Sequence, residues 1–217
     1  TNRQNLVFRG LDDAQLPRLH QRLEAIGMAE PGAELSRDVV ACPGADTCNL
    51  AITRSRGLAQ ALEAHLSALP LAQDPGAKAI GVKISGCPNS CGQHHIADIG
   101  FYGSSRKVGE REVPHYVLLL GGRTREGEAR FGQVVGRIPA RRVPEAVERI
   151  LKRYLEERQN GESFQAYLDR VGAASFKPLL QDLQEVPPYE EAPEFYQDLG
   201  AEGEAFSVQL GRGECAV

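Results

Sequence analysis

The chain has 217 residues, of which 41% are hydrophobic and 25% are charged, a composition typical of globular proteins that bury a sizeable core. Its net charge of −4 gives no electrostatic basis for binding nucleic acid, and no apolar run approaches the ~18 residues of a membrane span. The first residues, TNRQNLVFRG, carry no secretion signal and no initial Met. We therefore expect a cytoplasmic chain that begins mid-protein and has neither nucleic acid nor a membrane as a partner.

The N-terminal segment predicts one strand followed by one helix. Residues 5–11 form a short apolar run of strand type, and residues 12–27 carry leucines and isoleucine at helical spacing. Asp12 is the expected cap of this helix and Gly27 its end. Because such a unit is too small to fold alone, we expect it to pack on something else.

A second helix is predicted over residues 49–69, directly after a Gly/Pro loop that carries the first two cysteines. Asn49 is the expected cap, and Gly57 is a weak point inside the helix. This interpretation places Cys48 at the positive end of the helix dipole.

The rest of the chain predicts strands, a linker, two helices and a tail. Alternating or continuous apolar runs indicate strands over 79–85, 96–103 and 115–122. A linker is expected over 71–78, a polar hairpin or loop over 104–112, and helices over 143–159 and 163–172. From about residue 187 the chain is rich in Pro, Glu, Gly and aromatic residues, which favours an extended tail lying on a surface.

Four of the five cysteines form two tight pairs, Cys42 with Cys48 and Cys87 with Cys91, and Cys215 stands near the C-terminus. An odd number without a secretion signal argues against a disulfide framework, and neither pair has the spacing of a thioredoxin-like redox motif. Zinc remains an alternative, although the spacing of the first pair is unusual for it. A 4Fe–4S cluster needs four thiolates, one for each iron. The residues therefore favour an iron–sulfur cluster over zinc and over unligated thiols.

The segments ACPGADTCNLA (41–51) and SGCPNSCGQHHIADIGFYG (85–103) together resemble the cluster motifs of the sirohaem-containing nitrite and sulfite reductases. The opening segment TNRQNLVFRGL resembles the start of the second half of that family's ferredoxin-like domain. Residues 135–172 resemble the helical end of its cluster domain. The resemblance extends over about residues 1–183.

The resemblance implies cofactors and the residues that hold them. It places the ligands of a 4Fe–4S cluster on Cys42, Cys48, Cys87 and Cys91, and it implies that Cys91 also bridges to the iron of sirohaem as the catalytic cysteine. Further residues are implied as cofactor-binding: Asn89, Gln4 and Asn5. Because sirohaem carries many carboxylates, it requires cationic partners, and the local candidates are Arg3, Arg54, Arg56 and Lys83.

The implied activity is the six-electron reduction of sulfite to sulfide, or of nitrite to ammonia, with electrons from ferredoxin or a flavoprotein. The Cys-Pro-Gly at 42–44 favours sulfite, because nitrite-reducing members more often carry Cys-Thr-Gly. In the family, the cations that bind the anion come mainly from the first half of a longer chain. We therefore interpret this sequence as a C-terminal half that needs the N-terminal half of the same enzyme and does not turn over alone.

The expected fold class is α+β, a small mixed sheet with covering helices. The predicted organisation is the end of a ferredoxin-like half-domain over 1–36, a cluster- and sirohaem-binding domain over 37–185, and an extended tail over 186–217. Two other classes remain open, namely a zinc-stabilised structural or interaction module and a haem-free iron–sulfur electron-transfer protein.

Two features receive no cofactor role from the resemblance. His94 and His95 follow the second cysteine pair, and we expect neither to ligate metal, although one of them could deliver protons. Cys215 is expected to be an ordinary tail thiol, with contact to a redox partner as the alternative.

Overall fold

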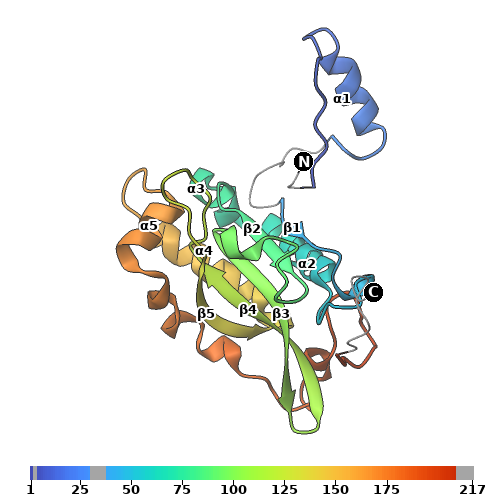
Figure 1. The fold of residues 1–217 in the computed structure, drawn as a ribbon, viewed down its shortest axis with the longest axis vertical. Helices are drawn as coiled ribbons and strands as arrows, with labels where there is room; N and C mark the ends of the chain where they lie inside the picture. The colour runs from blue at the N-terminus through green and yellow to red at the C-terminus, as the bar shows by residue number, and fades with distance from the viewer. Residues whose placement is uncertain (2–3, 30–37, 209–217) are drawn as a thin grey trace.

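The computed structural model describes residues 1, 4–29 and 38–208. Its centre is a mixed sheet with the spatial order β1-β2-β3-β4-β5 (Figure 1). The first three strands run parallel and the last two pairings are antiparallel. The strands span Val40–Ala41 (β1), Val82–Ser85 (β2), Ile99–Val108 (β3), Arg111–Leu120 (β4) and Gln133–Pro139 (β5). The expected fold class, a small mixed sheet with helices, is confirmed.

Alternate residues of the central strands point into one core because the register places them side by side. Phe101 of β3 pairs with Ile84 of β2 on one side and with Leu118 of β4 on the other. All three side chains are fully buried. Burying such apolar residues contributes about 1.5–3 kcal/mol each relative to exposure, so this row stabilises the sheet that carries the cysteine loops.

Two long helices cover this core. The helices span Leu16–Glu24 (α1), Ser55–Ala68 (α2), Pro75–Lys78 (α3), Val143–Glu157 (α4) and Phe164–Val171 (α5). Leu58, Leu62 and Leu66 recur every four residues on α2, and all three are fully buried in the core that α4 also joins. The four-residue spacing of these leucines therefore marks the buried face of α2.

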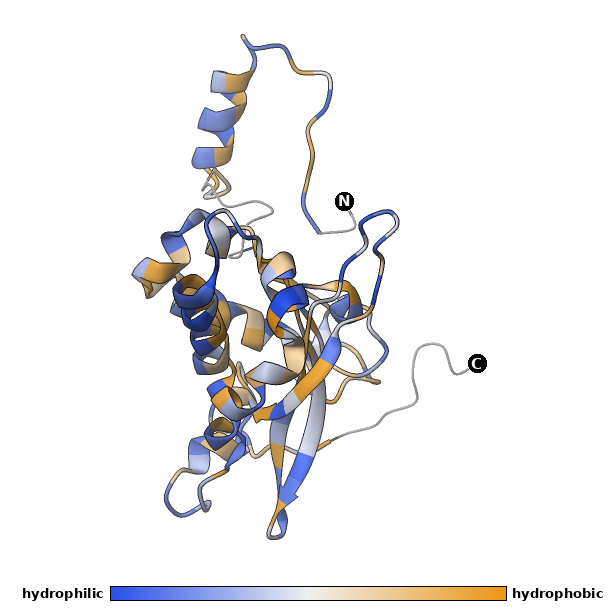
Figure 2. Cartoon of the chain, turned by 90° about the vertical axis from the view of Figure 1, so that its left-hand side faces the viewer, coloured by the Kyte–Doolittle hydropathy of each residue, from blue (hydrophilic) through white to orange (hydrophobic). Residues whose placement is uncertain are grey.

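Most of the N-terminal segment, residues 6–29, extends away from the sheet (Figures 1 and 2). α1 buries none of its residues, and Leu6, Phe8 and Ile26 of this segment are exposed. The strand predicted over residues 5–11 does not form, because no described strand lies beside it to pair with its backbone. The helix itself is confirmed in a shorter form.

The second helix begins later than predicted. α2 starts at Ser55, its N-cap residue is Arg54, and Asn49 does not cap it. The reason is tertiary: the backbone N–H groups of Ile52 and Thr53 both donate to the carbonyl of Gly86, at 2.8 and 3.0 Å, instead of entering a helical ladder. A contact with the second cysteine loop therefore overrides local helix propensity here.

The stretch 104–112, predicted as a polar hairpin or loop, is the end of one long hairpin of β3 and β4 that turns at Gly109, which has a positive φ. Two other elements differ from expectation. The predicted linker contains a 3₁₀ turn and the short helix α3. β5 was not predicted, because its pairing with β4 includes a register shift at Leu118/Leu119 and its pattern shows no clean alternation.

The last described segment, residues 186–208, is called the C-terminal strap below (red in Figure 1). Its side chains are anchored rather than free. Tyr196 is 3% exposed and packs edge-on to Tyr189 at 5.2 Å, while the guanidinium of Arg111 lies 3.8 Å from the centre of the Tyr189 ring. The backbone N–H of Val208 donates to Glu112 at 2.8 Å, so the strap reaches the long hairpin.

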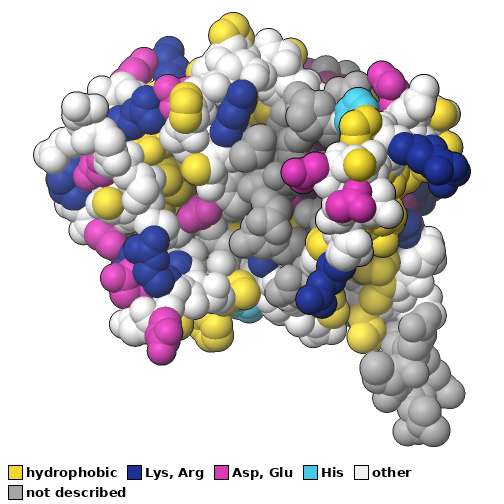
Figure 3. Space-filling model, turned by 90° about the horizontal axis from the view of Figure 1, so that it is seen from above, with side chains coloured by type: hydrophobic (Ala, Val, Ile, Leu, Met, Phe, Trp, Pro, Cys, Tyr) yellow, Lys and Arg dark blue, Asp and Glu magenta, His cyan; other side chains and the backbone are white. Residues whose placement is uncertain are grey.

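The surface mixes charges of both signs. On the face seen in Figure 3, lysine and arginine side chains are interspersed with aspartate and glutamate. None of the helices within the described residues is long and apolar enough to cross a membrane.

Candidate functional site

The two cysteine loops follow the carboxyl ends of neighbouring parallel strands. Cys42 comes directly after β1, and Cys87 comes two residues after β2. In sheets of this kind, ligands bind at the carboxyl ends of the strands, where connecting loops converge. The parallel pairing of β1 and β2 therefore brings together two loops that are far apart in the sequence.

Cys87 lies within electrostatic reach of the other three thiols. The pKa of Cys87 is raised by burial, and also by Cys42, Cys48 and Cys91, while the backbone N–H of Asn89 lowers it. All four sulfurs are free thiols, so neither pair forms a disulfide. Four thiolates gathered without counter-charge repel one another, so this arrangement favours a cationic inorganic centre between them.

Gly86 joins the two loops. Its backbone N–H donates to Sγ of Cys42 at 3.1 Å, and its carbonyl accepts from Ile52 and Thr53 of the first loop. A Cβ at position 86 would lie 2.7 Å from the carbonyl oxygen of Thr53 and 2.9 Å from Cα of Gly44. The close approach of the two loops therefore requires glycine here.

The start of α2 contacts the first cysteine. The hydroxyl of Ser55 donates to the carbonyl of Cys42 at 2.7 Å and lies 3.4 Å from its Sγ. Although the helix begins at Ser55 rather than Asn49, its positive end still contacts this loop. A helix N-terminus and hydrogen-bond donors both favour the thiolate form of cysteine.

The four thiols differ in exposure. Cys42 and Cys87 are only 7% and 8% exposed, and Cys48 is half-buried. Cys91 is exposed, and so is Asn89 two residues before it. One thiol of the four is thus accessible from outside the loops, together with the asparagine that precedes it.

The predicted residues Gln4 and Asn5 lie beside β1. The side-chain amide of Gln4 donates to the carbonyl of Ala41 at 2.8 Å, next to Cys42, and the amide of Asn5 donates to Asp38 at 2.7 Å. The structure therefore places this part of the opening motif next to the first cysteine loop.

The predicted cationic residues have protein partners. Arg56 donates to the carbonyl of Pro43 at 3.1 Å and lies 3.4 Å from Asp46, so it braces the first cysteine loop. Lys83 donates to Gln93 at 2.7 Å, two residues after Cys91. Arg54 faces the C-terminal strap. Arg3 lies outside the described residues, as does Cys215.

The two histidines stack over the second loop. His94 is fully buried, its Nδ1 lies 2.8 Å from the hydroxyl of Ser85, and its Nε2 has no hydrogen-bond partner among the described residues. Burial, with a contribution from His95, lowers the pKa of His94 to about 4, so it is neutral at pH 7. The ring of His95 lies 4.1 Å from that of His94, and its Nδ1 is 3.0 Å from Ser90.

The donor set fits a cluster better than a single ion. Among the described residues, no three His, Cys, Asp or Glu side chains gather closely enough to hold one metal ion. A 4Fe–4S cluster takes one thiolate per iron, so its ligands surround a volume instead of converging on a point. The N–H donor to Cys42 is also the kind of contact that tunes such clusters.

A profile of the family described as "Nitrite and sulphite reductase 4Fe-4S domain" matches residues 32–186, which include all four clustered cysteines. The chain belongs to this family. The iron–sulfur interpretation of the two cysteine pairs is thus supported at the level of the domain. The matched range ends where the C-terminal strap begins.

Curated relatives in this family are much longer. The chain is 29% identical over 172 residues to ferredoxin sulfite reductase 1 of Mycolicibacterium paratuberculosis, covering 77% of this chain and 31% of that protein. It is 35% identical over 127 residues to ferredoxin–nitrite reductase of Synechococcus elongatus, covering 57% and 23%. For the haemoprotein beta-component of NADPH sulfite reductase from Chromohalobacter salexigens, the identity is 29%, with 79% and 28% covered. The chain spans less than a third of the length of these relatives.

Solved structures agree with the family. The NirA protein of Mycobacterium tuberculosis superposes with a TM-score of 0.62 at 28% identity, covering 75% of this chain and 30% of that one. A dissimilatory sulfite reductase I gives a TM-score of 0.55 at 16% identity, which supports the fold alone.

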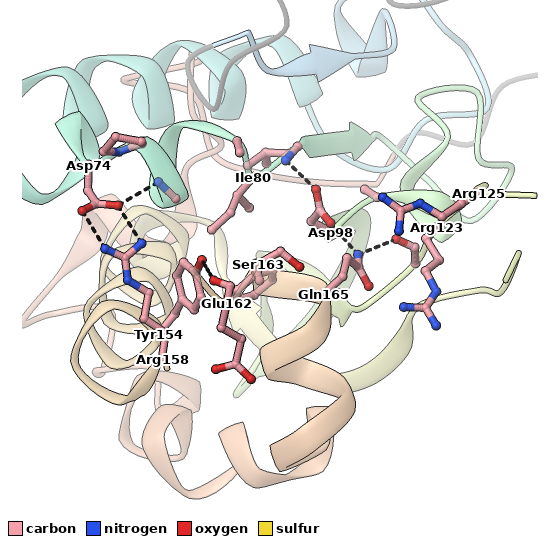
Figure 4. A pocket seen from close by; sticks show the side chains of 18 of the residues that line it. Asp74, Ile80, Asp98, Arg123, Arg125, Tyr154, Arg158, Glu162, Ser163 and Gln165 are labelled. Carbon is pink, nitrogen blue, oxygen red and sulfur yellow. Dashed lines mark hydrogen bonds and ion pairs between the residues drawn. The ribbon is translucent and has the colours of Figure 1, made fainter. Parts of the chain in front are cut away.

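A cavity of about 830 Å³ in this 4Fe–4S domain lies near the amino ends of β2 and β3, at the other end of these strands from the cysteine loops (Figure 4). None of the four clustered cysteines lines it. Two of its carboxylates already have protein partners: Arg158 donates to both carboxylate oxygens of Asp74 at 2.9 and 2.8 Å, and Asp98 accepts from Gly81 and Gln165. We therefore assign the site to the cysteine loops and not to this cavity.

Sequence reasoning missed three residues at the site. Gly86 and Ser55 contact Cys42 directly, and Asp198 of the strap holds the start of α2. The glycine before the second cysteine pair was a usable signal, because close loop contact requires glycine. Asp198 had no local signal, since its partner lies 144 residues earlier in the chain.

Proposed function

We propose that this chain is the cluster- and sirohaem-binding part of a reductase that converts sulfite to sulfide in a six-electron reduction. The proposal rests on family membership and on one observation: two thiols are covered, one is half-covered and Cys91 is exposed. In this proposal Cys42, Cys48, Cys87 and Cys91 hold a 4Fe–4S cluster, one thiolate to each iron.

The exposed position of Cys91 supports its proposed second role. A thiolate that is accessible from outside can be shared with sirohaem, whereas the buried sulfurs of Cys42 and Cys87 cannot reach beyond the loops. Asn89, Gln4 and Asn5 are the proposed contacts to the macrocycle. When bound, the two cofactors supply electron transfer and reduction of the anion.

The chain's own residues keep the thiolates in place. Gly86 donates to Sγ of Cys42, and Ser55 holds the Cys42 carbonyl, so the first loop is fixed before any cofactor binds. Such preorganisation reduces the cost of bringing four like charges together.

Nitrite reduction to ammonia is the second candidate, because a relative that shares 35% identity over 127 residues is named a ferredoxin–nitrite reductase. The Cys-Pro-Gly at 42–44 supports sulfite as the first choice. Relatives whose names include ferredoxin or NADPH support a ferredoxin or a flavoprotein as the electron donor.

The anion site is proposed to need more than these 217 residues. The resemblance assigns the anion-binding cations to the N-terminal half of the enzyme, and the relatives are more than three times as long as the matched stretch. The 217-residue chain alone is therefore predicted to hold the cluster but to lack a complete sirohaem pocket, and not to reduce sulfite or nitrite.

Anaerobic reconstitution tests the proposal. The purified chain is incubated with iron and sulfide and then with sirohaem, while absorption, iron, sulfide and zinc contents and electron paramagnetic resonance are recorded. We expect a brown protein, and sharp haem bands once the N-terminal half of the enzyme is added together with sirohaem. A Cys91→Ser variant should lose both signals, and the matched Cys215→Ser variant should keep them.

Two results would contradict the proposal. A colourless chain that takes up zinc in preference to iron would indicate a zinc-stabilised module. A stable cluster that gains no haem bands from sirohaem even with the N-terminal half present would indicate a haem-free electron-transfer protein.

A further inference from the structure

A buried carboxylate of the C-terminal strap meets the start of α2. Oδ2 of Asp198 accepts the backbone N–H of Arg54 at 2.7 Å, and Oδ1 accepts the N–H of Leu199 at 2.9 Å. Asp198 is only 4% exposed. Because the first N–H groups of a helix lack partners within the helix, Asp198 supplies a cap from a remote part of the chain.

The side chain of Arg54 extends the same contact to the first cysteine loop. Its guanidinium donates to the carbonyl of Gly200 at 2.8 Å and to Glu204 at 3.2 Å in the strap, and it lies 3.9 Å from Asp46. Asp46 stands between Cys42 and Cys48. Arg54 thus joins the strap, the helix start and the cysteine loop.

The backbone of the strap also rests directly on α2. A Cβ at Gly57 would lie 1.9 Å from the carbonyl oxygen of Leu199 and 2.5 Å from its carbonyl carbon. The glycine that weakens the helix by composition is therefore the residue that lets the strap approach. No side chain larger than hydrogen is compatible with this contact.

The strap covers the side of the loop where Cys48 lies. A cavity of about 350 Å³ lies between the strap and this loop. Cys48 and Ile52 of the loop line it together with Asp198, Ala201 and Phe206 of the strap. Cys48 is half-buried here, in contrast to the exposed Cys91.

We propose that Asp198 is a positioning residue for the cluster site: it holds the first turn of α2 and keeps the strap over Cys48, so that Ser55 stays against Cys42. The strap begins where the matched family range ends. The part of the inference that concerns the cluster rests on the proposed function, whereas the part that concerns Cys48 does not.

The first test uses the 217-residue chain without cofactor. Iodoacetamide labelling under reducing conditions is followed by mass spectrometry for each cysteine. Asp198→Ala removes the cap, and Gly57→Ala displaces the strap while favouring the helix itself. Both should accelerate labelling of Cys48 about fivefold, the change in opening equilibrium expected for the loss of a helix cap. Glu191→Gln, at an exposed position of the strap away from Arg54, is the matched control and should leave the rate unchanged.

Cys87 and Cys91 serve as internal references. General unfolding would expose the buried Cys87 together with Cys48, whereas the strap proposal requires a selective gain at Cys48. Unchanged Cys48 reactivity in both variants, or an equal gain at Cys87, would overturn the proposal.

The second test uses the reconstituted chain. Asp198→Asn keeps the shape of the side chain but removes its charge and one acceptor, so the cluster should be lost to a chelator about tenfold faster and its reduction potential should shift to a more positive value. Glu191→Gln should change neither quantity, and Asp198→Glu should restore part of the potential. An Asp198→Asn cluster with the wild-type potential and lifetime would overturn the positioning role.

The two proposals fail in distinguishable ways. If the wild-type chain takes up no cluster, the proposed function fails, and the labelling of Cys48 still decides whether Asp198 and Gly57 hold the strap.

Discussion

The backbone N–H of Gly86 donates to Sγ of Cys42 at 3.1 Å, and this hydrogen bond links two loops that lie 44 residues apart in the chain. A hydrogen bond of this kind strengthens when the acceptor is a thiolate rather than a thiol. The same contact therefore joins the two loops and places a backbone donor on the sulfur that we propose as a cluster ligand.

Replacement of Gly86 by alanine should destabilise the junction. The added Cβ would lie 2.7 Å from the carbonyl oxygen of Thr53, which belongs to the backbone and cannot rotate away. We expect a loss of about 1–3 kcal/mol in the free energy of unfolding, measured by urea denaturation of the cofactor-free chain. In the control Gly136→Ala, the Cβ meets the flexible end of Gln184 at 3.3 Å, and the loss should be clearly smaller. Equal losses in the two variants would contradict this account.

Replacement of Ser55 by alanine should affect both stability and the cluster. The variant loses the hydrogen bond to the carbonyl of Cys42 and a hydroxyl 3.4 Å from its sulfur. We expect a loss of about 1 kcal/mol in the free energy of unfolding. We also expect a more negative reduction potential of the reconstituted cluster, because the hydroxyl can turn its single proton from the Cys42 carbonyl to the thiolate and the variant lacks this donor. A potential unchanged in redox titration would show that the hydroxyl does not act on the cluster.

Two cysteine variants should separate ligation from packing. Cys91 is exposed and Cys87 is 8% exposed, so Cys91→Ala should change the stability of the cofactor-free chain by less than about 0.5 kcal/mol. Cys87→Ala should cost about 1 kcal/mol, because it leaves a small cavity. Both variants should fail to retain a full cluster in iron and sulfide analysis. A full cluster in Cys91→Ala would remove this residue from the ligand set.

The stability of the cofactor-free chain should depend on pH through His94. Its folded-state pKa is lowered from 6.5 to about 4, mainly by burial. The unfolded chain therefore binds the proton first, and stability present above pH 6.5 is lost as the pH falls toward 4, by about 3 kcal/mol in total. In the Asp198→Asn variant the urea midpoint of unfolding should fall as the pH is lowered across this range. The variant is used because it lacks a second titrating group whose effect on stability has the opposite pH dependence.

That opposing group is Asp198. Burial raises its pKa from 3.8 to about 6, so the folded chain binds the proton first. The stability it contributes is fully present below pH 3.8 and is lost as the pH rises through 6, again by about 3 kcal/mol. The free energy of unfolding of His94→Gln should therefore fall as the pH rises from 4 to 6. That of the wild type should stay nearly constant over this range, because the effects of His94 and Asp198 cancel. A wild-type slope equal to that of either variant would refute the compensation.

Local patterns predicted the elements where one short segment decides its own structure. The spacing of apolar residues gave α4 and the buried face of α2, and the two cysteine pairs indicated the chemistry of the site. The start of α2 could not be read in this way, because Ile52 and Thr53 donate to Gly86 of another loop. β5 and the failed strand over 5–11 depend in the same way on whether a partner strand lies alongside.

By itself, then, the sequence determined the elements with a clear period and the four thiols that suit a cluster, since both depend on residue type and spacing along the chain. The tertiary structure alone decided that Gly86 closes the two loops, that Cys91 stays exposed, and that Asp198 caps a helix 144 residues earlier. These contacts arise from the parallel pairing of β1 and β2 and from the path of the strap, and no local propensity encodes a hydrogen bond between distant segments.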